Sequence, residues 1–332
     1  MNNELFPIVW FGLIGFALTL YVILDGFSLG IGILFPFVRD DEQRGIMLTS
    51  ASPFWDGNQT WLVLSTAGLY GAFPLVYASL LPAMYLPLVL MLMCLFFRGM
   101  TFEFRSEADS YKGFDIGFSI ATLAVAFIQG MIVGSVIGGL ASDDSNFAED
   151  AFGWFSWFGL CTGAALVIGY ALLGAAWLIV KTEGRLQRRF YSMVRPLMSL
   201  FVVSMLTVVV WTPFVNERIA ERWSRFPNLL WLGLVAVLML GLAVATVRSA
   251  ARRHEKRIFL LVVAMFVLGL IGLIASLYPI MLPPDITLWK AASSRSSQQF
   301  LLVGYAIMIP ITLGYTAYSY RVFRGKVRES EE

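Results

Sequence analysis

Long apolar runs recur along the whole chain and constrain its fold more than any other feature. A helix needs about 20 mainly apolar residues to cross the hydrocarbon core of a bilayer. The composition agrees with a membrane location, because 58% of the residues are hydrophobic, 14% are charged and the mean hydropathy is +0.74. We therefore predict an all-α polytopic protein whose residues 1–332 form a single integral membrane domain of helix bundles. We exclude a soluble enzyme and a nucleic-acid-binding protein. The nine predicted spans lie at about 8–34, 53–73, 78–98, 115–140, 153–180, 196–215, 227–247, 258–280 and 298–320.

The distribution of basic residues predicts the orientation of these spans. If the N-terminus is outside, 19 of the 24 Lys and Arg residues fall in inner loops or the C-terminal tail, and none falls inside a span. Lys and Arg accumulate on the cytoplasmic side of membrane proteins. We therefore predict an outer N-terminus, a cytoplasmic C-terminus and an odd number of spans. The outer loop with Asp143, Asp144, Glu149 and Asp150 contains no base, which agrees with this orientation.

Two carboxylates, Asp25 and Asp56, fall inside predicted spans. A charged side chain at the bilayer centre costs about 2.5–3.5 kcal/mol on the cautious scales, so each acid needs a partner, a proton or a path of water. Asp25 lies in ILDGFSLGIG, roughly 13 Å from the inner end of its span at 1.5 Å per residue. Two hypotheses stay open: Asp25 carries protons, or it makes a polar contact that a neighbouring helix satisfies.

Asp56 lies in the polar segment SASPFWDGNQTWL. The Ser-Pro pair at 52–53 predicts a helix start, which places Asp56 in a first turn where the helix dipole stabilises a carboxylate. Gln59 shares the helix face of Asp56, and Asn58 is adjacent. Such a group of polar side chains is typical of the inner entrance of a polar path, although helix capping alone would also explain Asp56.

A third polar group follows in FFRGMTFEFRSE, at the inner end of the third span. Arg98, Glu103 and Arg105 either form a structural ion network, with one another or with Asp56, or lie in a solvated positive loop.

The chain offers few ligands for metals or haem. His254 is its single histidine and lies in a basic inner loop, and the two cysteines lie in apolar runs. One histidine cannot supply the paired axial ligands of a bis-histidine haem. Two cysteines and one distant histidine do not make a tetrahedral zinc site. We predict that this chain ligates neither haem nor metal, so that any redox centre lies in another chain.

Three segments together resemble subunit II of cytochrome bd-type quinol oxidases: DGFSLGIG at 25–32, SPFWDGNQTWL at 52–62 and FFRGMTFEFRS at 96–106. The short outer loops resemble the cyanide-insensitive branch. The resemblance implies a multi-pass protein of the bacterial cytoplasmic (inner) membrane, in an electrogenic respiratory enzyme that oxidises quinol and reduces oxygen to water. It implies a haem-binding subunit I as partner, with two b-type haems and one haem of d type or a variant. A small single-helix subunit and a structural quinone occur in some members and stay open here.

The resemblance also assigns residues. Four residues match family positions associated with a proton or cation path at the subunit interface: Asp25, Asp56, Asn58 and Gln59. Arg98 and Arg105 match motif positions for which we expect a structural role. Lys290 departs from the family pattern, in which an acid is common, so the resemblance assigns no detailed role to that outer loop. From the residues alone, a proton-coupled secondary transporter is the alternative function.

Overall fold

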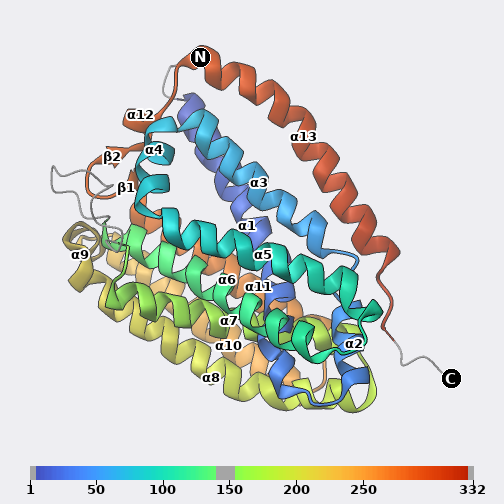
Figure 1. Cartoon of the computed structure of the whole chain (residues 1–332). Helices are drawn as coiled ribbons and strands as arrows, with labels where there is room; N and C mark the ends of the chain where they lie inside the picture. The colour runs from blue at the N-terminus through green and yellow to red at the C-terminus, as the bar shows by residue number, and fades with distance from the viewer. Residues whose placement is uncertain (1–4, 140–153, 328–332) are drawn as a thin grey trace.

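The computed structural model describes residues 5–139 and 154–327 and is almost entirely helical (Figure 1). In this part of the chain, eight helical segments are long and apolar enough to cross a membrane. They are α1 (Leu5–Leu34, continued by η1, Phe35–Phe37), α5 (Tyr85–Phe104, continued by η2, Arg105–Glu107), α6 (Lys112–Gly138), α7 (Trp157–Lys181), α8 (Gly184–Val215), α10 (Asn228–Ala251), α11 (Glu255–Leu277) and α13 (Arg295–Val322). The predicted all-α polytopic class is confirmed.

A ninth span depends on a bent pair of helices. α3 (Trp55–Ala72) and α4 (Pro74–Ala83) pass the same test only together, and their axes differ by 118°. Pro74 begins α4, where its missing N–H costs nothing. The prediction of a third span at 78–98 is therefore wrong in its bounds. The second apolar run bends into α4, and the third span, α5, begins at Tyr85.

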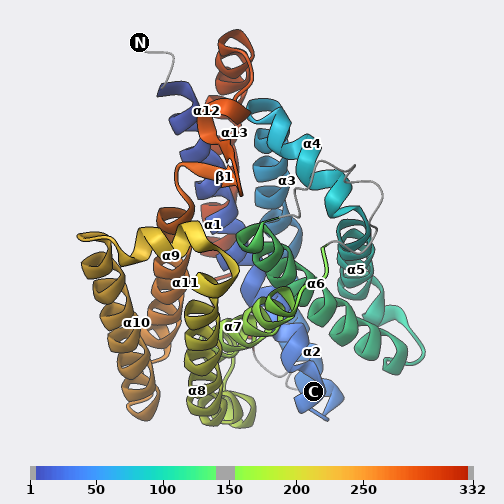
Figure 2. The ribbon, with the colours of Figure 1, turned by 90° about the vertical axis from the view of Figure 1, so that its left-hand side faces the viewer.

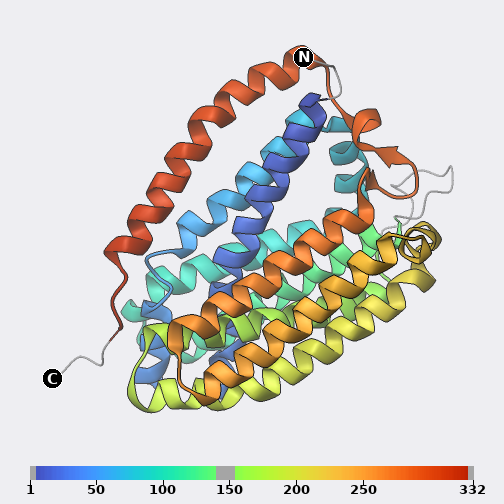
Figure 3. The ribbon, with the colours of Figure 1, turned by 180° about the vertical axis from the view of Figure 1, so that it is seen from behind.

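The short elements gather at the two ends of the bundle (Figures 1 and 3). One end holds the start of α1 together with α4, α9 (Glu217–Ser224), α12 (Leu288–Ala291) and the antiparallel strands β1 (Ile280–Leu282) and β2 (Ile286–Thr287). The other holds α2 (Asp41–Thr49) and the end of α13. The loops that we predict to be cytoplasmic share this second end, which we call the basic end. The acidic loop at 143–150 lies outside the described residues.

Two apolar cores hold the helices together. The larger lies between the second half of α1 and helices α6, α7, α8 and α11, and includes Phe27, Tyr170 and Trp177. The smaller lies between the first half of α1 and helices α3, α4, α12 and α13. Helix α7 is central. In its most apolar stretch of 18 residues 72% is buried, whereas the same measure for α13 is 6%. Figure 2 shows α8, α10 and α11 on one side of α7 and α5 on the other.

Helices α1 and α7 cross at two glycines. A Cβ atom on Gly30 would collide with the backbone carbonyl of Tyr170, and one on Gly174 would lie 2.5 Å from the carbonyl carbon of Gly30. Only glycine allows the two backbones to approach this closely. This contact brings the polar side chains of the two helices together.

The C-terminal segment is fixed to the body of the protein at the basic end. Nζ of Lys181, in the last turn of α7, donates hydrogen bonds to the carbonyls of Phe323 and Gly325. The N–H of Val327 donates to the carbonyl of Lys181 at 2.8 Å. Because Phe323 is the C-cap of α13, the Lys181 ammonium lies where the helix dipole favours a cation.

Candidate functional site

A fully buried ion pair lies at the centre of the candidate site. Nη1 and Nη2 of Arg98 donate to Oδ2 and Oδ1 of Asp25 at 3.0 and 2.9 Å, and both side chains are 0% exposed. The prediction that every basic residue lies outside the spans is therefore wrong for Arg98, which α5 places inside the bundle. A buried carboxylate needs such a bidentate partner because neither charge is stable in an apolar interior alone.

Asn58 fixes the first turn of α3 beside Asp25. Its Nδ2 donates to the carbonyl of Leu24 at 2.7 Å, and its Oδ1 accepts from the hydroxyl of Tyr320 at 3.1 Å. Asp56 lies two residues before Asn58, and Asp25 follows Leu24. The two acids therefore lie at a similar level of the bundle, side by side rather than one above the other. From the sequence we expect Asp25 to lie deeper than Asp56, and the contact of Asn58 with Leu24 places the first turn of α3 beside this part of α1.

Asp56 itself is exposed and forms no ion pair with the described residues. Trp55 stacks on Phe102 of α5 with ring centroids 5.7 Å apart, and Gly57 lies against the ring of Tyr315 of α13. Its two neighbours in sequence thus contact α5 and α13, and Asp56 lies between these contacts, exposed on the surface of this chain. α3 begins at Trp55, two residues after the predicted start, and Asp56 is still in its first turn.

Several buried polar atoms near the ion pair have no hydrogen-bond partner within the described chain. They include Nε of Arg98, Oγ of Ser28 and Nε2 of Gln59. Ser28 lies on the helix face of Asp25, one turn further along α1, and Gln59 follows Asn58. Buried polar groups usually bond to ordered water when no protein group reaches them. The ion pair therefore lies in surroundings that suit water molecules.

A second polar chain near Asp25 was not predicted. The hydroxyl of Tyr21 accepts a hydrogen bond from Nε2 of Gln129 at 2.5 Å, and the hydroxyl of Tyr170 donates to Oε1 of Gln129 at 3.0 Å. Tyr21 lies one helical turn before Asp25 on α1. The one sequence signal for this group is Gln129, an amide inside the apolar run VAFIQGMIV of α6.

A separate ion network lies at the basic end of the bundle and joins α2, the end of α5 and the start of α6. Asp115, in the first turn of α6, is 4% exposed and accepts from Nε of Arg105 at 2.6 Å and from Nη1 of Arg44 at 2.8 Å. The guanidinium of Arg105 also lies 4.4 Å from the ring centroid of Tyr111. The structure thus pairs Arg105 with an acid that the sequence analysis does not single out. Glu103 is exposed and has no ion pair among the described residues, and neither Arg98 nor Arg105 pairs with Asp56.

Comparisons with known proteins identify the family. The profile described as cytochrome bd terminal oxidase subunit II matches residues 6–323. The chain belongs to this family. Relatives include cytochrome bd-I ubiquinol oxidase subunit 2 of Escherichia coli (strain K12), 26% identical over 100% of this chain and 97% of that protein. Cytochrome bd ubiquinol oxidase subunit 2 of Bacillus subtilis (strain 168) is 25% identical over 97% of each chain.

A solved structure has the same fold. It is the bd oxidase from Geobacillus thermodenitrificans, one chain of which matches with a TM-score of 0.80 and 16% identity, over 96% of this chain and 98% of that chain. A subunit II implies a subunit I as its partner in a terminal oxidase. Together with the apolar helices, family membership makes the chain a multi-pass subunit of a respiratory oxidoreductase. The residues that the structure describes contain no group of three His, Cys, Asp or Glu side chains that could hold a metal ion.

Proposed function

We propose that this chain is the non-haem subunit of a quinol oxidase in the bacterial inner membrane, and that it supports the haem subunit and holds part of a proton path. Quinol oxidation and oxygen reduction would take place at haems of the partner subunit. The chain would act as one membrane domain, with its N-terminus outside and the basic end in the cytoplasm. The observation that carries this proposal is the buried Asp25–Arg98 pair. The pair lies beside the first turn of the neighbouring helix α3, which carries the exposed Asp56.

The proposed path runs from Asp56 across α3 to Asp25. Asp56 lies in the first turn of α3 and is exposed on the surface of this chain, so its carboxylate could receive protons there. Gln59 lies one turn further along the same helix, and its Nε2 has no hydrogen-bond partner among the described residues. Asn58 holds this turn against Leu24, next to the ion pair. In this proposal Arg98 and Asn58 position the carboxylate of Asp25, and Arg105 with its partners fixes the end of α5.

The surface around Asp56 supports the scaffolding part of the proposal. Helices α3, α5 and α13 each carry exposed apolar or aromatic side chains, among them Val63 of α3, Phe96 of α5 and Tyr318 of α13. A lipid-facing surface would not favour a carboxylate at this place. We therefore place subunit I on the surface formed by α3, α5 and α13, where it would cover Asp56. The proposal assigns neither a quinone nor a small third subunit to a particular surface.

The test uses Asp56→Asn in the assembled oxidase. We expect oxygen consumption with quinol to fall by an order of magnitude or more, because a positioned proton donor contributes about 10²–10⁴-fold. The haem spectrum and the yield of the complex should stay normal. Asp56→Glu, which keeps a carboxyl group, should retain most of the activity. Glu107→Gln is the matched control, because Glu107 is exposed at the same end and has no ion pair with the described residues.

Two outcomes would contradict the proposal in different ways. Normal turnover in Asp56→Asn would remove Asp56 from the path but leave the subunit assignment intact. Purification of this chain without haem bands or a second large subunit, combined with substrate uptake in vesicles, would favour the transporter alternative instead.

A further inference from the structure

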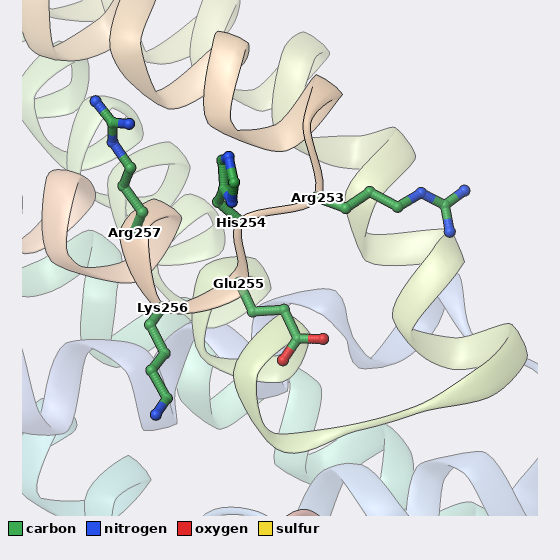
Figure 4. A pocket seen from close by; sticks show the side chains of 5 residues that line it. All are labelled: Arg253, His254, Glu255, Lys256 and Arg257. Carbon is green, nitrogen blue, oxygen red and sulfur yellow. The ribbon is translucent and has the colours of Figure 1, made fainter.

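The turn between α10 and α11 forms a cationic hollow at the basic end. The hollow is open to one side, has a volume of about 430 Å³ and is lined by Arg253, His254, Glu255, Lys256 and Arg257. Figure 4 shows the three cationic side chains extending from the turn in different directions, with His254 and Glu255 between them. The single acid of the hollow is already engaged, because Oε1 of Glu255 accepts from Lys326 at 2.9 Å and from Gln187 at 2.7 Å. The three cations of the hollow form no ion pair with the described residues. The hollow therefore carries positive charge that the described chain does not neutralise.

The first turns of α8 add further positive charge beside this hollow. The hydrogen bond from Gln187 to Glu255 joins the start of α8 to the start of α11. The guanidinium of Arg253 lies 5.8 Å from the ring centroid of Tyr191 in α8. Arg185, Arg188 and Arg189 belong to these same turns of α8 and form no ion pair with the described residues. The two segments thus form one cationic surface at the ends of three neighbouring helices.

Apolar stripes run from this cationic surface along the helices. On α11, Leu260 is three residues after Arg257 on the same face and is 64% exposed, and Ile271 continues that face at 55%. On α10, Val244 is four residues before Arg248 and is 48% exposed. Each helix thus presents a cation at its end, followed by apolar side chains toward the middle of the membrane. A molecule that matches both parts has an anionic head and a long apolar tail.

We propose that this hollow binds the headgroup of an anionic phospholipid, whose acyl chains lie along α10 and α11. Basic pockets between membrane helices favour such headgroups at the cytoplasmic surface. A free phosphate ion would match the cations and would leave the apolar stripes without a partner. The site lies at the ends of α10 and α11, on the opposite side of α7 from α5 (Figure 2).

The test compares lipid binding to the assembled complex by native mass spectrometry in detergent, with phosphatidylglycerol and phosphatidylcholine as probes. One variant combines Arg253→Gln, Lys256→Gln and Arg257→Gln. A Lys or Arg near an anionic headgroup contributes about 1 kcal/mol, so three lost charges should weaken phosphatidylglycerol binding on the order of 100-fold. Phosphatidylcholine binding should not change. The matched control combines Arg39→Gln, Lys112→Gln and Arg324→Gln, three exposed bases of the basic end without ion pairs to described residues.

The proposal predicts that the control triple keeps its phosphatidylglycerol binding. Equal weakening in both triples would overturn it, because the effect would then come from net charge alone. Displacement of the lipid by inorganic phosphate would also overturn it, in favour of a small-anion site. Unchanged binding in the first triple would place the lipid elsewhere or leave the hollow to a protein partner. If that triple fails to assemble, Arg257→Gln alone should weaken phosphatidylglycerol binding severalfold, and unchanged binding would count against the site.

Discussion

Removing Arg98 should expose how strongly the bundle depends on its buried ion pair. In Arg98→Met, Asp25 would keep its place at 0% exposure and lose both charged hydrogen bonds, at 2.9 and 3.0 Å. Breaking a buried pair by removing one partner costs about 3–5 kcal/mol, because the remaining charge is uncompensated. Replacing both partners with apolar residues of similar volume is far less harmful. We therefore expect Arg98→Met to cost about 3–5 kcal/mol, and Asp25→Leu combined with Arg98→Met to recover most of it.

The free energy of unfolding is measured on the purified complex by titration with dodecyl sulfate in mixed micelles, followed by near-ultraviolet circular dichroism. Arg44→Met is the matched control, because Arg44 is 20% exposed and Arg105 would still pair with Asp115. Its loss should cost less than the loss of Arg98, because Asp115 keeps the charged hydrogen bond from Arg105. A cost below about 1 kcal/mol for Arg98→Met, with Asp25 intact, would refute the reasoning. It would mean that water or another group already stabilises the carboxylate.

Two further predictions concern packing and the C-terminal segment. Gly30→Ala should destabilise the chain by about 1–3 kcal/mol, because its Cβ would push α1 from the backbone of α7. The control Gly12→Ala, with open space around it, should be neutral or slightly stabilising. Equal effects of the two substitutions in the same titration would rule out the close crossing. Lys181→Met should release the end of α13, because the hydrogen bonds from Lys181 to the carbonyls of Phe323 and Gly325 are lost. Trypsin should then cut after Arg324 severalfold faster than in the unsubstituted complex. An unchanged cleavage rate would show that other contacts fix this segment.

Hydropathy predicts most of the spans because it depends on local composition. Hydropathy fails where the chain changes direction inside an apolar run, as it does at Pro74. The bend into α4 contains no polar loop that would mark the end of a span. Hydropathy also misplaces Arg98. A base at the end of an apolar run is expected to reach the membrane surface, and only the packing of α5 against α1 turns it inward to Asp25.

The candidate site was predictable only in part for the same reason. Asp25 and Asn58 stand out because a carboxylate and an amide are rare in apolar segments. Tyr21 and Tyr170 do not stand out, since tyrosine is common in membrane helices and at their ends. Their shared hydrogen-bond partner, Gln129, comes from a third helix. Pairing across helices depends on their contacts, which no single segment of the sequence encodes.

The contacts of α13 have a consequence for how the chain is made. Tyr320 reaches Asn58 across 262 positions of sequence, and Tyr305 donates to the carbonyl of Leu64 across 241. During translation, the first third of the chain therefore lacks these contacts until α13 has left the ribosome. Until then, the side-chain oxygen of Asn58 lacks its tyrosine. The polar contacts of Asn58 are thus complete only after α13 has packed against α3.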